Sequence, residues 1–137
     1  MANYNCVIRT NYFHVKNNTM FEDFMKTVYG EDEVFMFKKG DMYGFGCYGE
    51  IMGIRNPEDE NEDEYDSPYD AFIDGLQKHV TDNDAVIIME FGNEKLRHIS
   101  GTVGVITSKK VKYMDTTDLA MDIAKKLLNN KNYETQF

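Results

Sequence analysis

The chain is poor in the residues that mark secreted or membrane-spanning proteins. Its 137 residues include no tryptophan, two prolines and two cysteines. Cys6 and Cys47 lie far apart and do not form the dense framework of a small secreted domain, so we expect reduced, packed thiols. No apolar run approaches the roughly 20 residues that span a bilayer, and the N-terminus has no basic region followed by an apolar one. We therefore expect a cytoplasmic protein with no membrane partner.

Basic side chains are also scarce, with 15 Lys and Arg against 24 Asp and Glu and a formal charge of −9. The imbalance lies between residues 56 and 77, where there is no base. The nine carboxylates there are Glu58, Asp59, Glu60, Glu62, Asp63, Glu64, Asp66, Asp70 and Asp74. Without them the chain holds 15 acids and 15 bases. Direct nucleic-acid binding is not expected, because it needs an excess of Lys and Arg.

The apolar content, 42% of the chain with 13% aromatic residues, is sufficient for one folded domain. Hydrophobic periodicity predicts strands over 3–15, 34–37, 42–54, 85–91, 95–106 and 111–114. Helices are expected over 19–29, from Ser67-Pro68, and from Asp115 or Thr116. Because short turns join most strands, the expected fold class is α+β, a mainly antiparallel sheet of about six strands covered by about three helices. The expected organisation is a single domain over 1–137, with an acidic loop at 56–67 and a fraying tail at 129–137.

Three local expectations are specific enough to test. Thr19 and Glu22 have the spacing of a capping box at the start of the first helix. Gly92-Asn93 is typical of a tight turn between two strands. The last helix is expected to bury its apolar stripe, which consists of Leu119, Ala120, Ile123, Ala124, Leu127 and Leu128.

Two motifs resemble cofactor or metal sites without meeting their requirements. Residues 44–49 have the Gly-x-Gly-x-x-Gly spacing of a dinucleotide loop, but a strand rather than a helix is expected to follow. Residues 59–70 have oxygen-bearing side chains at EF-hand offsets, but Glu64 replaces the turn glycine and Asp70 the bidentate glutamate. Weak divalent binding is the most that this pattern predicts. His14, His79 and His98 do not form a spaced cluster, so we expect no cofactor and no metal site.

An enzyme is the first alternative function, with Cys47 or His98 as the reactive residue. No spacing in the chain places a nucleophile beside a base, so binding is favoured over catalysis. Five bases and no carboxylate lie between Lys95 and Met114, which predicts a basic hairpin separate from the acidic segment. An oligomer joined through exposed strand edges is the second alternative.

The acidic segment allows three interpretations: a solvated loop, a weak metal site, or a surface that mimics nucleic acid. In the third, carboxylates at phosphate-like intervals occupy the basic groove of a nucleic-acid enzyme. The partner-binding residues would then be Glu58, Asp59, Glu60, Glu62, Asp63, Glu64 and Asp66.

Several segments together resemble a known group of proteins: residues 9–13, 44–49, 94–97, 101–108 and 134–137. The group consists of small, uncharacterised proteins from Gram-positive gut bacteria, often encoded on conjugative or other mobile elements. The resemblance extends over nearly the whole length and carries no catalytic motif. It implies an accessory role of the kind filled by antirestriction and anti-CRISPR factors, many of which are small and acidic. The combined expectation is a non-enzymatic accessory factor that binds a basic protein surface.

Overall fold

Strands and helices alternate along the chain in an order that brings distant segments together. The computed structural model describes residues 4–55 and 67–136. The strands are β1 (Asn5–Thr10), β2 (Val28–Gly30), β3 (Val34–Lys39), β4 (Met42–Tyr48), β5 (Ile51–Ile54), β6 (Val86–Glu94), β7 (His98–Ile106) and β8 (Val111–Asp115). The helices are α1 (Asn18–Met25), α2 (Pro68–His79) and α3 (Thr116–Leu127).

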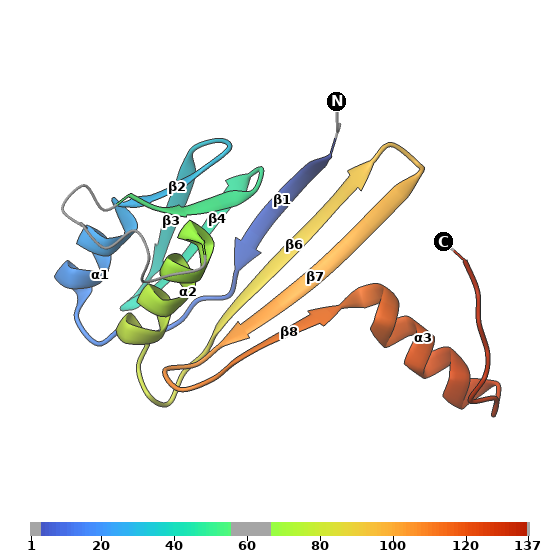
Figure 1. Ribbon diagram of the computed structural model, residues 1–137. Helices are drawn as coiled ribbons and strands as arrows, with labels where there is room; N and C mark the ends of the chain where they lie inside the picture. Colours follow the sequence, from blue (N-terminus) through green and yellow to red (C-terminus); the bar gives the residue numbers. More distant parts are fainter. Residues whose placement is uncertain (1–3, 56–66, 137) are drawn as a thin grey trace.

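Six of the strands form one antiparallel sheet in the order β3-β4-β1-β6-β7-β8 (Figure 1). In its centre, β1 pairs with β4 on one side and with β6 on the other. The remaining strands, β2 and β5, form a small second sheet. The predicted α+β class and the six-stranded antiparallel sheet are therefore confirmed.

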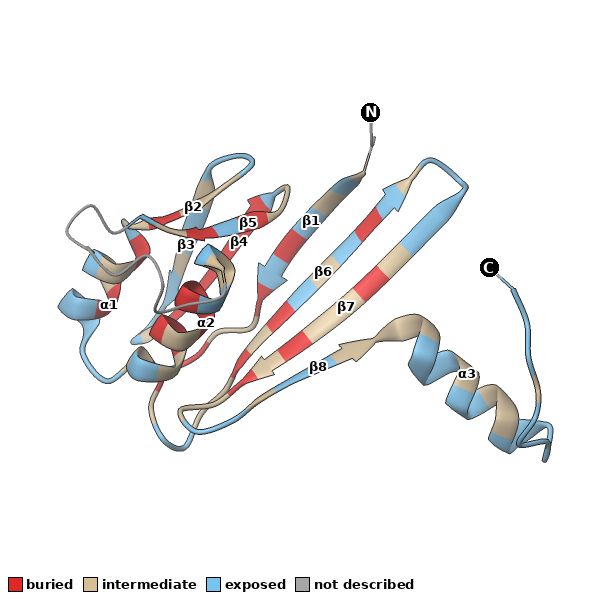
Figure 2. Ribbon diagram, viewed as in Figure 1, coloured by how far each residue is buried: buried red, intermediate tan, exposed pale blue. Residues whose placement is uncertain are grey.

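The core lies on one face of the large sheet, beneath α1, α2 and the small sheet (Figures 1 and 2). Its centre is aromatic: Phe13, Phe21, Tyr43, Phe45 and Phe72 are each 1% exposed or less. The Phe13 ring meets those of Phe21 and Phe45 edge-on, and Phe72 stacks on Phe24. Such geometry lets rings interdigitate at the density of a protein interior.

Helix α2 begins as its sequence predicts. The side chain of Ser67 accepts a hydrogen bond from the amide of Asp70, and Pro68 occupies the first turn. Gly53 of β5 lies directly against Pro68, since a Cβ at Gly53 would come within 2.5 Å of that residue. The close approach holds the start of α2 against the small sheet.

Three local predictions were wrong. Helix α1 is capped by Asn17, whose side chain accepts from the Met20 amide, so Thr19 lies inside the helix. The helix ends at Met25, and β2 follows because it pairs with β5. Gly92 and Asn93 continue β6 opposite β7, and the turn falls at residues 95–97 with Lys95 at φ 52°.

The structure differs most from the sequence prediction at helix α3. It begins at the predicted cap, where the Asp115 side chain accepts from the Thr117 amide. None of its residues is buried, however, and it projects away from the sheet instead of covering it (Figures 1 and 2). The expected burial of its apolar stripe is therefore wrong for the isolated chain.

The acidic residues predicted to bind a partner lie outside the described residues. These are Glu58, Asp59, Glu60, Glu62, Asp63, Glu64 and Asp66. Within the described ranges, no helix has the length and apolar character needed to cross a membrane.

Candidate functional site

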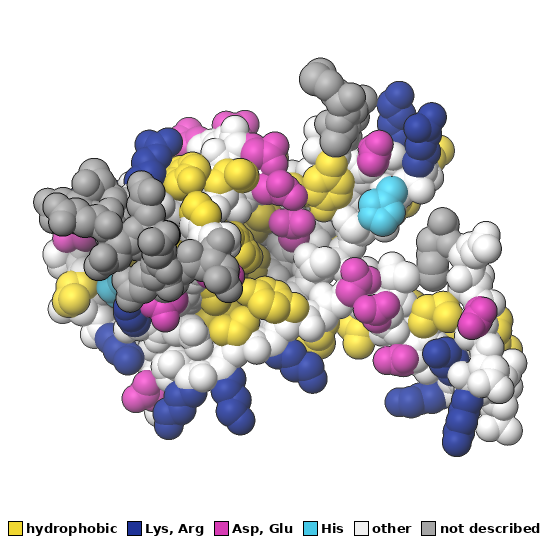
Figure 3. All heavy atoms as spheres, in the orientation of Figure 1, with side chains coloured by type: hydrophobic (Ala, Val, Ile, Leu, Met, Phe, Trp, Pro, Cys, Tyr) yellow, Lys and Arg dark blue, Asp and Glu magenta, His cyan; other side chains and the backbone are white. Residues whose placement is uncertain are grey.

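A hollow of about 620 Å³ lies on the helix-bearing face of the large sheet, between β5, α2 and the β7–β8 edge. Its walls come from five parts of the chain, and we call it the acidic hollow. The residues that line it are Glu50, Ile51, Met52, Tyr69, Glu90, Thr102, Tyr113, Met114, Asp115 and Asp118. Four of these are carboxylates and none is Lys, Arg or His. Figure 3 shows acidic side chains gathered along the middle of this face.

The surroundings of Glu50, one of the carboxylates that line the hollow, raise its pKa. Partial burial raises the pKa of Glu50, and the charges of Glu90 and Glu31 raise it further. The Glu31 carboxylate also accepts a hydrogen bond from the Glu50 amide at 3.2 Å. Burial, together with the charges of Glu90, Glu50 and Glu31, raises the pKa of Cys6 to about 12. The site is therefore one of concentrated negative potential, where a cation would be stabilised.

No intramolecular cation neutralises these carboxylates in the part of the chain that the structure describes. The ion pairs found there use other acids, namely Asp23, Asp41, Asp74, Asp82 and Asp84. The described residues also hold no group of three or more ligands able to bind a metal ion. Among the described residues, the carboxylates that line the hollow therefore have no ion-pair partner.

Two tyrosines give the hollow its apolar walls. Tyr69 belongs to the first turn of α2 and packs on Phe72, and burial raises its pKa. Tyr113 belongs to the edge strand β8, and burial followed by the charge of Asp70 raises its pKa. An acidic site with aromatic walls suits lysine and arginine side chains, whose stems are apolar and whose heads are charged.

The elements that precede and follow the acidic segment in the sequence both line the acidic hollow. Strand β5 ends at Ile54 before the segment, and α2 begins at Pro68 after it. Both elements line the hollow, through Met52 and Tyr69. Sequence reasoning missed the hollow because its carboxylates are scattered along the chain. The one available signal was Glu90, a lone charge within the apolar run of residues 86–91.

The two residues proposed for catalysis lie in different settings, Cys47 buried and His98 exposed. Cys47 is buried in β4 and its Sγ lies 3.5 Å from the backbone oxygen of Asp32. Burial raises the pKa of Cys47, which favours the unreactive thiol. His98 is exposed at the start of β7, opposite Glu94 in the register.

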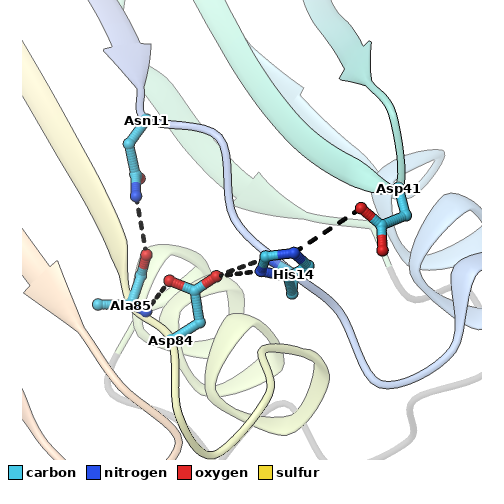
Figure 4. Close-up of polar contacts among 5 residues, drawn as sticks. All are labelled: Asn11, His14, Asp41, Asp84 and Ala85. Atoms are coloured by element: carbon cyan, nitrogen blue, oxygen red, sulfur yellow. Dashed lines mark hydrogen bonds and ion pairs between the residues drawn. The ribbon is translucent and has the colours of Figure 1, made fainter.

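His14 and Asp84 form a polar pair at the end of the sheet, 70 residues apart in sequence (Figure 4). Asp84 accepts from the His14 amide and the Ala85 amide, both at 2.8 Å, and lies 2.9 Å from His14 Nδ1. Partial burial would raise the pKa of Asp84, but these hydrogen bonds and the histidine lower it overall. The other ring nitrogen lies 3.7 Å from Asp41. With carboxylates on both sides the imidazole has no nucleophile to activate, and the pair serves to join β1 to β6.

The opposite side of the large sheet has a different character, and we call it the open face. The strand register places on it the side chains of Val7, Arg9, Phe35, Phe37, Lys39, Tyr48, Ile87, Met89, Phe91, Ile99, Val103, Val105, Lys112 and Met114. Neither Asp nor Glu occurs on this face in the six strands. Arg9 lies over the rings of Phe37 and Tyr12, at 4.2 and 5.6 Å from their centroids.

The glycine motif and the bases also have structural explanations. Gly44 and Gly46 lie on the open face within a paired strand, as the rejection of a dinucleotide loop predicted. The bases between Lys95 and Met114 do not form one patch. Lys95 and Arg97 lie at the β6–β7 turn, whereas Lys109 and Lys110 lie in the turn at the other end of the nine-residue β7. About 30 Å of strand separates the two turns.

No protein-family model, curated protein or solved structure matches this chain.

Proposed function

We propose that the protein is a binding factor that captures a basic surface of another protein on its acidic side. The observation that carries the proposal is the acidic hollow, where Glu50, Glu90 and Asp118 face a cavity of about 620 Å³ whose lining contains no base. Carboxylates that form no ion pair within their own chain attract a positively charged partner during association and hold it once it is bound.

The acidic segment supports a more specific form of this proposal, in which the protein inhibits a nucleic-acid enzyme. Its seven carboxylates between 58 and 66 come between β5 and α2, the two elements that wall the hollow. Together with the hollow they would present one acidic surface to a groove that normally binds phosphates. This is the antirestriction or anti-CRISPR type of activity that the resemblance implies.

The first experiment measures binding of a fluorescent arginine-rich peptide by anisotropy at low and moderate salt. The triple variant Glu50→Gln, Glu90→Gln and Asp118→Asn should weaken binding about tenfold, since each lost charge contact contributes about 0.5 kcal/mol. The matched control neutralises Asp23, Asp41 and Asp82, exposed acids that form the described surface ion pairs. Equal losses in both variants would show that only net charge matters and would contradict a site at the hollow.

The second experiment tests nucleic-acid mimicry. The protein is added to a DNA-cleaving enzyme with a basic groove, and cleavage is followed as the DNA concentration increases. Competitive inhibition is expected, and changing the seven carboxylates between 58 and 66 to Asn and Gln should abolish it while the circular dichroism spectrum stays unchanged. Inhibition that persists in this variant at moderate salt would reject the segment as the binding surface.

A further inference from the structure

Helix α3 has an apolar side that none of the described residues covers. Leu119, Ile123 and Leu127 are spaced four residues apart and therefore share one side of the helix. They are 44%, 56% and 82% exposed. An amphipathic helix gains most of its stability by packing this side on another surface.

The open face is a second apolar surface that residues 4–55 and 67–136 leave uncovered. On the open face, Phe35 is 41% exposed and Tyr48 is 69% exposed, and their rings contact each other edge-on. Strand β6 is apolar at nearly every position from Val86 to Phe91, a pattern typical of strands buried on both faces. Helices α1 and α2 cover only one of those faces.

The open face also has a recess that suits aliphatic side chains. A hollow of about 240 Å³ lies there, walled by Val7, Phe35 and Tyr48 and including Gly46. Gly46 is buried beneath this recess, where a Cβ would come within 2.8 Å of the Ile8 backbone oxygen and 3.6 Å of the Arg9 side chain. Glycine at this position thus allows the close approach of β4 to β1 beneath the recess.

Helix α3 cannot reach the open face of its own sheet. Strand β8 ends at Asp115 and α3 begins at Thr116, so no linker allows the helix to turn back. The Thr116 hydroxyl donates to the carbonyl of Gly101 at 3.0 Å and fixes the first turn on β7. The helix therefore continues outward beyond the sheet edge (Figure 1).

The apolar side of α3 faces the same way as the open face. Thr116 lies three residues before Leu119 and belongs to the same helix side. Its hydroxyl is 2.9 Å from the point where a Cβ of Gly101 would stand, a position on the open face that the Phe91 ring also approaches. Asp118, on another side of the helix, lines the acidic hollow.

We propose that two copies of this chain form a symmetric dimer by exchanging α3, each helix laying Leu119, Ile123 and Leu127 on the open face of the partner. The geometry favours a second copy because the chain supplies both halves of the contact and cannot join them internally. Strand spacing makes the open face roughly 25 Å by 20 Å, and a 12-residue helix is about 18 Å long. Reciprocal exchange would bury on the order of 800 Å² per copy, the size of a stable two-fold interface.

The test is sedimentation velocity on the full chain over a range of concentrations. The wild type should sediment as a dimer at micromolar concentration. Ile123→Asp, at an exposed helix position, and Tyr48→Glu, at an exposed sheet position, should each yield a monomer with an unchanged circular dichroism spectrum. Met20→Asp is the matched control, because Met20 is an apolar residue of α1 that is 59% exposed and lies outside the exchanged surfaces. This variant should remain a dimer.

Three results would overturn the exchange: a monomeric wild type at every concentration, a dimer that both variants leave intact, or a dimer broken by Ile123→Asp but not by Tyr48→Glu. The last pattern would indicate that α3 packs on α3 of the partner. Because the acidic hollow is on the other side of the sheet, Ile123→Asp should keep its affinity for the arginine-rich peptide. The dimer and the proposed function can therefore fail independently.

Discussion

The two faces of the six-stranded sheet differ in cover and in charge. One face packs against α1 and α2 over an aromatic core and, beside that core, carries the acidic hollow. The open face has apolar side chains, three bases and no strand carboxylate. The difference teaches that one sheet carries two unlike surfaces: the covered face holds the core and a hollow lined by carboxylates, whereas the open face exposes apolar side chains.

The comparison is tested most strongly by replacing one phenylalanine on each face and comparing the changes in the free energy of unfolding. Phe72 of α2 is fully buried and contacts Phe24, Phe45 and Tyr69. Phe72→Ala should lower the free energy of unfolding by about 3–5 kcal/mol, because it removes a buried ring and leaves a cavity. Urea denaturation monitored by circular dichroism measures the change.

The matched variant is Phe35→Ala on the open face. At concentrations where the chain is monomeric, it should cost less than about 1.5 kcal/mol, since much of the ring already contacts water. Equal losses for Phe35 and Phe72 would mean that the open face is part of the folded core of the monomer, and the contrast between the faces would be lost.

A smaller effect comes from the pair that joins the end of β1 to β6. Asp84→Ala removes the acceptor of two amide hydrogen bonds and should lower the free energy of unfolding by about 1–3 kcal/mol near neutral pH. Because the native pKa of Asp84 is lowered, the ionised carboxylate stabilises the fold fully above its unfolded pKa of about 3.9. The difference between wild type and variant should shrink as pH falls below that value through the lower native pKa.

Thermal denaturation between neutral and acidic pH measures this dependence. Asp41→Ala is the control, since Asp41 lies 3.7 Å from the same histidine but its side chain is 81% exposed. It should change stability by less than about 0.5 kcal/mol. A pH-independent loss in Asp84→Ala would show that the side chain acts by packing alone.

Local sequence patterns predict much of the fold, but they do not predict which parts of the chain pack on which surfaces of the sheet and helices. Ser67 and Pro68 mark the start of α2 because a cap involves neighbouring residues only. The helical pattern predicts Tyr29 within the first helix, whereas the structure pairs it with Gly53, a contact that no local pattern reveals. The acidic hollow is hidden for the same reason, since Glu50, Glu90 and Asp118 come together only in the folded sheet.

Helices α2 and α3 also show that a local sequence pattern does not predict whether an apolar side is buried. Both are 12 residues long, and both have an apolar side at helical spacing. In α2 that side buries Phe72, Ile73 and Leu76, whereas in α3 it stays exposed. Periodicity indicates that a helix has an apolar side, and the connection to the preceding strand decides whether the same chain can cover it.

The smallest effect concerns Glu50, whose ionised form the fold disfavours. Its pKa is raised by burial and by the charges of Glu90 and Glu31, so the ionised carboxylate destabilises the native state. This cost is absent below the unfolded pKa of about 4.3 and develops as pH rises through the higher native pKa. Glu50→Gln should therefore raise the free energy of unfolding by a few tenths of a kcal/mol at neutral pH, and by less at pH 4, in paired urea titrations. A gain in stability together with a loss of peptide binding would show that the carboxylate is kept for its partner, at a small cost to the fold. A loss of stability at neutral pH would instead assign Glu50 a structural role and remove it from the binding site.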